Sequence, residues 1–260
     1  TNNVGVIGML GADSIAENQI KILENEGIDT SLIFRHEGMP SGQAYVIVDR
    51  KGENVILTYQ AANLAIMPEE VAQPKVLSAI DNSSTVIVID PPLDTAGSLI
   101  TYASKAGKRI IWSPALLTSY GISALQKYLS HVDYLILNQQ EAGSLTSIED
   151  GLEACSKISN SLSGINVVVT LGDKGCTLCT KGKNMIIPPL DFSSDLRIVS
   201  TVGAGDAFLG AFGAFKLKGF EDAQALYLAN VAAALKASRE DTRASPTFEE
   251  ITRYAYDNKR

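Results

Sequence analysis

Residues 199–208 read VSTVGAGDAF, a glycine-rich segment between two stretches of regular pattern. The short run Arg197 to Val199 leads into it and predicts a strand, and the apolar periodicity from Ala207 to Lys218 predicts a helix after it. Gly203 and Gly205 permit a tight turn between the two elements. The segment therefore predicts a strand, a glycine-rich turn and the start of a helix, in that order.

The first N–H groups of such a helix have no partner inside the helix and lie at the positive end of its dipole. A turn of this kind is a ready site for an anion such as a phosphate group. Asp206 would stand beside that anion, where its carboxylate can act as a general base for a hydroxyl that attacks the phosphate. The alternative is that Asp206 only caps the helix.

Length and composition are those of a globular protein with one substantial core. The chain has 260 residues, of which 45% are hydrophobic and 20% charged. Its net charge of −7 argues against nucleic acid and against an anionic membrane as partners. No apolar run reaches the ~18 residues of a membrane span, and no signal peptide precedes the first predicted strand. A cytoplasmic location is therefore expected.

The cysteines Cys155, Cys176 and Cys179 are too few and too odd in number for a disulfide framework. Cys176 and Cys179 form a C-x-x-C pair, but a short strand would turn their side chains to opposite faces. No second pair of Cys or His residues completes a zinc site. A structural role is expected for this pair, in a reducing compartment.

Apolar strands and helical patterns alternate along most of the chain. A capping box at Ser14 to Glu17 predicts a helix that stops at Gly27. Unbroken apolar strands separated by helices imply a parallel sheet that is covered on both faces. We predict an α/β fold with a doubly wound, mostly parallel sheet flanked by helices, as one domain over residues 1–260. The predicted strands are residues 3–10, 31–35, 85–90, 109–112, 134–137, 166–171 and 176–180.

Two alternating runs interrupt this order near the N-terminus. Gln43 to Asp49 and Asn54 to Tyr59 are separated by a turn that contains Gly52. They predict a β-hairpin that projects from the main sheet as a small lid, over about residues 41–62.

Polar residues and glycines follow two of the predicted strands, where ligands of open parallel sheets collect. Asn138 and Glu141 follow the strand 134–137 and face the same side of a helix start, where a capping box alone would also explain them. The segment Thr170 to Gly175 follows the next strand, and its glycines would let a nucleotide lie along the backbone or would form a plain hairpin turn. Asn230 lies among small apolar residues of a predicted helix and needs a hydrogen-bond partner, which can be a nucleotide or a loop.

The segment Thr201 to Asp206 resembles the C-terminal signature of the PfkB/ribokinase family of sugar and nucleoside kinases. This resemblance implies that Gly203, Ala204 and Gly205 form an anion hole, with Thr201 near the nucleotide. It implies that Asp206 deprotonates the substrate hydroxyl that attacks the γ-phosphate of ATP.

Ser200 departs from the family motif, which usually begins with Asp. In members of the family that potassium activates, this Asp is a ligand of the ion. The departure implies a kinase that does not depend on potassium. The alternative is that Ser200 caps the turn and that Glu240 or Asp241 supplies the missing ligand.

Further segments are similar to family motifs in the same order along the chain. The pair Asn138 and Glu141 is similar to the N-x-x-E motif, which implies nucleotide binding by Asn138 and Mg²⁺ binding by Glu141. Thr170, Gly172 and Gly175 match the T-x-G-x-x-G nucleotide loop, and Asn230 falls where the family places an Asn near the nucleotide. In the lid, Ser41 to Ala44 and Ala61 to Asn63 are similar to the segments that cover the sugar. The implied substrate contacts are Gly42, Ala44, Asn63 and Asp206.

Together these resemblances imply an ATP-dependent, Mg²⁺-requiring kinase that phosphorylates a hydroxymethyl group of a sugar. The alternatives are a nucleoside kinase of the same family, a kinase-fold protein that binds a nucleotide or sugar without turnover, and a structural partner in an oligomer. A homodimer through the lid is a further expectation. The family has a strand and a glycine-rich helix start, with substrate-binding Asp and Asn, before the point where this chain begins, and this segment is expected to be absent here.

Overall fold

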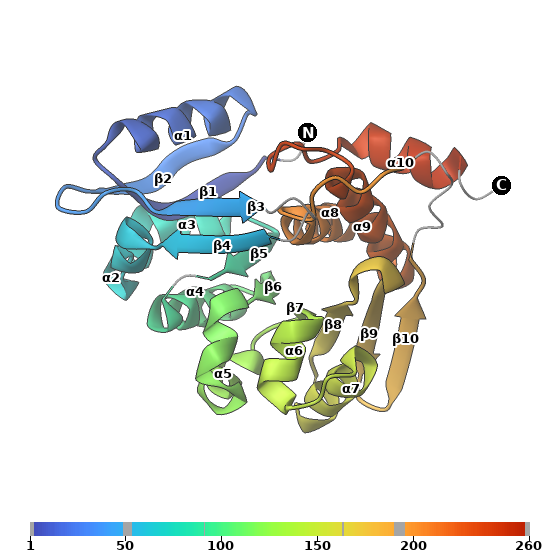
Figure 1. Ribbon diagram of the computed structural model, residues 1–260. Helices are drawn as coiled ribbons and strands as arrows, with labels where there is room; N and C mark the ends of the chain where they lie inside the picture. The colour runs from blue at the N-terminus through green and yellow to red at the C-terminus, as the bar shows by residue number, and fades with distance from the viewer. Residues whose placement is uncertain (1–2, 49–53, 91, 163, 190–195, 258–260) are drawn as a thin grey trace. The chain divides into compact units, whose positions relative to one another are not determined.

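The computed structural model describes residues 3–48, 54–90, 92–162, 164–189 and 196–257. The chain divides into two compact units (Figure 1). The first comprises Thr1–Ser83 and Asp90–Lys108, and the second comprises Ser84–Ile89 and Arg109–Arg260. That the whole chain acts as one kinase domain stays a prediction.

The second unit is built on a six-stranded sheet with strand order β10-β9-β8-β7-β6-β5. Strands β5 to β8 pair in parallel, and β9 and β10 are added antiparallel at one edge. The predicted mostly parallel sheet is therefore confirmed. The strands are β5 (Thr85–Ile89), β6 (Arg109–Ser113), β7 (Tyr134–Asn138), β8 (Asn166–Thr170), β9 (Cys176–Thr180) and β10 (Lys183–Ile187).

Helices cover both faces of this sheet, as alternation along the buried strands requires. Ile136, Val168 and Leu178 belong to one core cluster with α8 (Ala204–Leu217) and α9 (Asp222–Ala237). Val169 faces the other way, because a Cβ built on Gly151 of α7 (Gly151–Ser161) would lie 3.5 Å from it. The remaining elements of the unit are η2 (Ala115–Tyr120), α5 (Ile122–Leu129), α6 (Gln139–Thr146), η3 (Gly172–Lys174) and α10 (Phe248–Asp257).

A disulfide joins Cys155 of α7 to Cys179 of β9. A single disulfide agrees with the prediction that the chain has no disulfide framework. The sequence did not predict the pairing of Cys155 with Cys179. The two residues lie 24 positions apart in the sequence and meet because α7 packs on β9. Cys176 stays a free, buried thiol, so the C-x-x-C pair does not act as a unit.

The first unit contains two separate two-stranded sheets. Strands β1 (Gly5–Gly11) and β2 (Asp29–His36) are parallel and are joined by α1 (Ser14–Asn25). The prediction of a buried first strand is wrong over most of its length, because only Met9 and Gly11 in β1 are buried. Asp13, not Ser14, is the N-cap of α1, since its carboxylate accepts the N–H of Ala16 at 2.9 Å. The other elements are η1 (Ala61–Ala65), α2 (Pro68–Val71), α3 (Pro74–Asp81) and α4 (Leu93–Lys105).

The predicted hairpin is the second of these sheets. Strands β3 (Gln43–Val48) and β4 (Asn54–Tyr59) are antiparallel, with Gln43 opposite Tyr59. The turn between them lies outside the described residues. Apolar side chains on both faces are exposed: Tyr45, Ile47, Val55 and Leu57 on one face, and Val46 and Ile56 on the other. In the described part of the chain, no helix has the length and apolar character needed to cross a membrane.

Candidate active site

The glycine-rich segment forms a turn at the start of α8, which we call the phosphate turn (Thr201 to Asp206). Gly203 is the N-cap and has a φ of 81°. The predicted strand before it is absent, because residues 196–200 are not paired with any described strand. The N–H groups of Val199 and Ser200 instead donate to the carbonyl oxygen of Ala237, at 2.8 and 3.0 Å. The turn is thus attached to the C-terminal end of α9.

Some amides of the phosphate turn are already occupied. Val202 N–H donates to Ser200 Oγ at 3.4 Å, and Ala204 N–H donates to the Thr201 carbonyl oxygen at 3.1 Å. The N–H groups of Gly203, Gly205 and Asp206 have no acceptor among the described residues. These amides, more than those of Val202 and Ala204, are available to an anion at the helix start.

Asp206 and Gly205 are exposed in the first turn of α8, and Thr201 is exposed at the start of the phosphate turn. The carboxylate of Asp206 is therefore accessible beside the available amides. This arrangement matches the chemistry predicted for the segment: an anion held by backbone N–H groups, with a base adjacent to it.

Gly203 lies against a loop that follows α9. A Cβ at this position would be 2.7 Å from the Thr242 carbonyl oxygen and 3.3 Å from Lys236 Cε. Only glycine tolerates both this approach and the positive φ. Lys236 was not predicted as a site residue, although a lone lysine within the apolar pattern 223–237 was a signal for it.

Two of the predicted nucleotide residues, Asn138 and Thr170, lie at the ends of neighbouring strands of the six-stranded sheet. Asn138 at the end of β7 pairs with Thr170 at the end of β8, and Thr170 pairs with Cys176 of β9. Cys176 in turn pairs with Ile187 of β10. The structure therefore brings Asn138 and Thr170 side by side at the carboxyl ends of the parallel strands, where open α/β sheets bind ligands.

Asn138 and Glu141 form a capping box at the start of α6. Asn138 Oδ1 accepts the N–H of Glu141 at 2.8 Å, and Glu141 Oε2 accepts the N–H of Asn138 at 2.9 Å. Burial raises the pKa of Glu141, and the hydrogen bond from Asn138 partly offsets this. The capping alternative is thus present in the structure, and it does not exclude a role for the second carboxylate oxygen.

A magnesium ion would fit this position only with help from a substrate. In the described ranges, no group of three or more His, Cys, Asp or Glu side chains could hold a metal. Mg²⁺ is usually bound by one or two carboxylates together with substrate phosphates and water. The single carboxylate of Glu141 is compatible with that mode.

The loop Thr170 to Gly175 connects the antiparallel strands β8 and β9 and is a tight turn. Gly172 and Gly175 have φ values of 62° and 84°, and Leu171 N–H donates to the Gly175 carbonyl oxygen at 2.8 Å. A Cβ on Gly175 would lie 2.3 Å from the Ile187 carbonyl oxygen. Gly175 is therefore explained by packing, whereas no described residue lies within 4 Å of a Cβ on Gly172. Space above Gly172 remains open to a ligand.

Asn230 connects α9 to the segment that follows β10. Its side chain is 9% exposed and donates through Nδ2 to the Pro188 carbonyl oxygen at 3.3 Å. Burial raises the pKa of the Cys176 thiol to about 12, and a hydrogen bond from Asn230 opposes this. The loop alternative for Asn230 is therefore observed. Asn230 and Lys236 are both in α9, separated by about 9 Å along its axis.

Apart from Asp206, the predicted substrate residues belong to the first unit and lie beside the hairpin or in its first strand. Gly42 approaches Asn63 so closely that a Cβ would be 2.6 Å from Asn63 Nδ2. The N–H of Ala62 donates to the Pro40 carbonyl oxygen at 3.1 Å, which joins the same two segments. Ala44 is exposed in β3. The structure thus brings Gly42 and Asn63 together at the base of the lid.

Asp13, which the sequence did not single out, holds that base to α1 through Ser41. The Asp13 carboxylate accepts hydrogen bonds from the backbone N–H and from the hydroxyl group of Ser41, both at 2.7 Å. Ser41 Oγ in turn accepts the N–H of Gly11 at 3.1 Å. Hydrogen bonds to the carboxylate lower the pKa of Asp13, and the bond from the backbone N–H of Ser41 contributes most. Ser41 is fully buried. An Asp directly before a helix start was the available signal.

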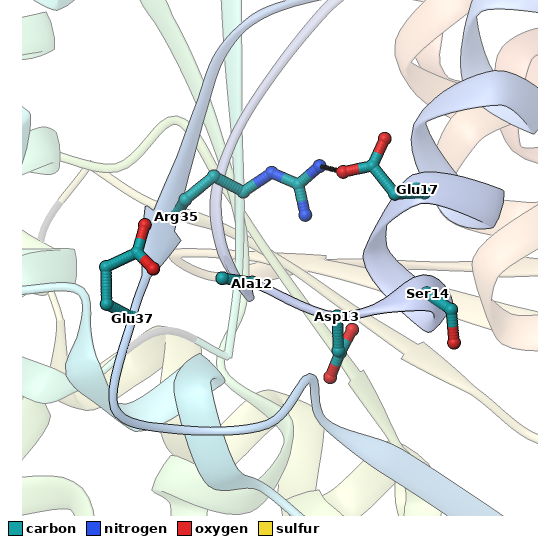
Figure 2. A pocket seen from close by; sticks show the side chains of 6 residues that line it. All are labelled: Ala12, Asp13, Ser14, Glu17, Arg35 and Glu37. Carbon is teal, nitrogen blue, oxygen red and sulfur yellow. Dashed lines mark hydrogen bonds and ion pairs between the residues drawn. The ribbon is translucent and has the colours of Figure 1, made fainter.

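A pocket of about 370 Å³ lies beside Asp13, lined by Ala12, Asp13, Ser14, Glu17, Arg35 and Glu37 (Figure 2). Arg35 reaches from β2 to Glu17 of α1, and its other nitrogen donates to the Gly11 carbonyl oxygen at 2.8 Å. None of the predicted site residues lines this pocket.

Comparison with known proteins places the chain among kinases. A model of the pfkB family of carbohydrate kinases matches residues 1–248. The chain is 28% identical over 253 residues to a ribokinase of Staphylococcus aureus, covering 94% of this chain and 80% of that protein. It is 26% identical over 262 residues to a deoxyribokinase of Salmonella typhi, covering 97% of this chain and 82% of that protein.

Solved structures confirm the predicted fold class. A ribokinase from Thermotoga maritima has a TM-score of 0.82 at 25% identity, covering 97% of this chain and 81% of that one. A ribokinase of Arabidopsis thaliana, solved with ribose and ATP, has a TM-score of 0.84 at 24% identity, covering 96% of this chain and 81% of that one.

Proposed function

The chain belongs to the pfkB family and is a carbohydrate kinase of the ribokinase type, and from this premise we propose how it transfers a phosphoryl group. The acceptor is a hydroxymethyl group of a free sugar, and the donor is ATP. Asp206 takes the proton of the attacking hydroxyl. The available amides of Gly203, Gly205 and Asp206 stabilise the charge that develops on the transferred phosphoryl group.

The single observation that carries this proposal is the phosphate turn, where an exposed carboxylate stands beside helix-start amides that have no acceptor among the described residues. As the new bond from the sugar oxygen to phosphorus forms, the bond from phosphorus to the leaving ADP oxygen breaks. The proton passes to Asp206. Positioning and electrostatic stabilisation supply most of the catalysis in such transfers.

We propose that the nucleotide lies along the sheet edge formed by Asn138 and Thr170, over the open backbone at Gly172. Asn230 supports this edge through its bond to Pro188. Mg²⁺ would be held by Glu141 together with the phosphates, and when bound it neutralises their charge. In this proposal Gly42, Ala44 and Asn63 contact the sugar.

The experiment that tests this function is an ATP-dependent phosphorylation assay across ribose, deoxyribose, fructose, 2-keto-3-deoxygluconate and nucleosides, with and without Mg²⁺. We expect turnover on a free pentose or hexose that requires Mg²⁺. Turnover on nucleosides alone would favour the nucleoside-kinase alternative. Nucleotide binding without turnover on any acceptor would favour a non-catalytic role.

The hairpin β3–β4 is expected to close over the sugar. Its two faces both expose apolar side chains, so one face remains for the substrate and the other for a second copy of the chain. Sugar together with a non-hydrolysable ATP analogue should slow amide hydrogen exchange of residues 43–48 and 54–59 at least about tenfold. Residues 248–257 of α10 serve as the internal control.

Unchanged exchange in the hairpin would contradict a closing lid, unless a dimer already covers it. We propose such a homodimer, so mass measurement under the exchange conditions accompanies the experiment.

A cytoplasmic location is also part of the proposal because ATP is available there. The Cys155–Cys179 disulfide is uncommon in that compartment.

Activity is expected to be independent of potassium. Ser200 Oγ accepts the N–H of Val202, so the serine caps the turn and offers no charge to a cation. The affinity of a site for a hard cation depends on the charge of its oxygen ligands. Exchange of potassium for a bulky organic cation at constant ionic strength should change kcat less than about twofold. A several-fold rise with potassium would show that the cation site survives and would contradict this interpretation of Ser200.

A further inference from the structure

Lys236 is a buried cation that the proposed chemistry does not yet use. Its side chain is fully buried in α9. Lysine is almost never fully buried without a partner, because removing an ammonium group from water is costly. Among the residues that the structure describes, Lys236 is in none of the ion pairs. Its one hydrogen bond is long, 3.5 Å from Nζ to the Arg239 carbonyl oxygen.

This ammonium group lies next to the phosphate turn. Lys236 Cε would be 3.3 Å from a Cβ on Gly203. With bonds of about 1.5 Å, Nζ is therefore within about 6 Å of the Gly203 Cα. Gly203 precedes Asp206 by three residues and is the residue of the turn that approaches the lysine.

The charges around Lys236 do not neutralise it. Burial lowers the pKa of Lys236, the carboxylate of Asp241 opposes this, and the guanidinium of Arg239 adds to it. Asp241 Oδ1 accepts the N–H of Arg243 at 2.9 Å, and Arg239 is paired with Glu250. Within the described ranges, the ammonium group therefore retains most of its hydrogen-bonding capacity, and the amides of Gly203, Gly205 and Asp206 have no acceptor there.

We propose that Lys236 is a positioning residue whose buried ammonium group strengthens anion binding by the phosphate turn from behind. The role rests on the proposed function and adds to it a fixed internal cation. A positive charge in a site of low dielectric attracts a phosphate over several ångströms without contacting it, and it needs no rearrangement during transfer. It also explains why α9 and the turn must approach so closely that Gly203 has no room for a side chain.

The test measures anion binding directly. Inorganic phosphate is titrated into the ¹⁵N-labelled protein at constant ionic strength, and the amide shifts of Gly203, Gly205 and Asp206 report the Kd. Lys236→Met should raise this Kd about tenfold, and Lys236→Gln, a second neutral variant, should do the same. Lys236→Arg should keep Kd within about threefold, because the charge is retained.

Lys216→Met is the matched control. Lys216 is also a mostly buried lysine of this unit, but it is paired with Asp222 at 2.6 Å. Its loss should lower thermal stability and leave the phosphate Kd unchanged. In the kinase assay, Lys236→Met should lower kcat about 10-fold or more with the KM for ATP within about twofold, a division that a general loss of stability would not produce.

Equal phosphate affinity in the wild-type, Met and Gln proteins would overturn the role of Lys236 even if the protein is a kinase. If Arg weakens binding as much as Met, shape and not charge is responsible, and the proposal is also wrong. Absence of phosphate shifts at these amides in the wild-type protein would overturn the anion site itself, and the proposed function with it.

Discussion

Replacement of Asp206 by asparagine is expected to lower kcat about 10²–10⁴-fold, with nucleotide affinity and thermal stability unchanged. Asparagine has nearly the same shape but cannot accept the proton of the attacking hydroxyl. The side chain is exposed in the first turn of α8, so its replacement leaves no buried group unpaired.

Asp94→Asn is the control, because it also removes a negative charge from the first turn of a helix. Asp94 is also exposed in the first turn of a helix, α4, and has no predicted role in the reaction. It should keep full activity. An Asp206→Asn protein that retains more than about a tenth of the wild-type kcat would contradict the assignment of Asp206 as the base.

Gly203→Ala is expected to destabilise the protein by about 2–4 kcal/mol and to abolish activity. Gly203 has a φ of 81°, and the new Cβ would lie 2.7 Å from the Thr242 carbonyl oxygen. Both the strained backbone and the collision require the turn to move away from α9. Urea unfolding followed by circular dichroism measures the change.

Substitutions at two further glycines of α8 separate the effect of the constrained backbone at Gly203 from the effect of a methyl group at the anion site. Gly210→Ala meets nothing within 4 Å and should raise stability by up to about 1 kcal/mol, as alanine does inside a helix. Gly205→Ala also meets nothing within 4 Å, so it should keep stability but lower activity by placing a methyl group at the anion site. Wild-type stability in Gly203→Ala would show that the turn is less constrained than the contacts indicate.

Much of the second unit was predictable because its strands are continuous apolar runs bounded by helical patterns. The strands Arg109–Ser113 and Tyr134–Asn138 lie within one residue of their predicted bounds. Burial on both faces imposes this pattern directly on the sequence. The hairpin of the first unit was equally clear, because two β-forming runs flank a short glycine-containing sequence, and β3 and β4 do pair antiparallel.

The local errors arose where tertiary contacts replaced secondary-structure partners. Residues 197–199 are apolar enough for a strand, but the amides of Val199 and Ser200 bond to Ala237. Asp13 took the N-cap from Ser14 because its carboxylate also reaches Ser41 at the lid base. Neither partner is near in sequence, so no short-range pattern could reveal them.

The sequence by itself determined the fold class and the family. It also predicts an anion site at the phosphate turn, because backbone amides at a helix start need only a glycine-rich segment before the helix. Tertiary structure alone decided which of those amides remain available, that Asn138 stands beside Thr170, and that Cys155 joins Cys179. It also placed the ammonium group of Lys236 behind Gly203. These arrangements depend on packing between residues that are distant in the chain. The periodicity of side chains along one segment does not tell which distant segment packs against it.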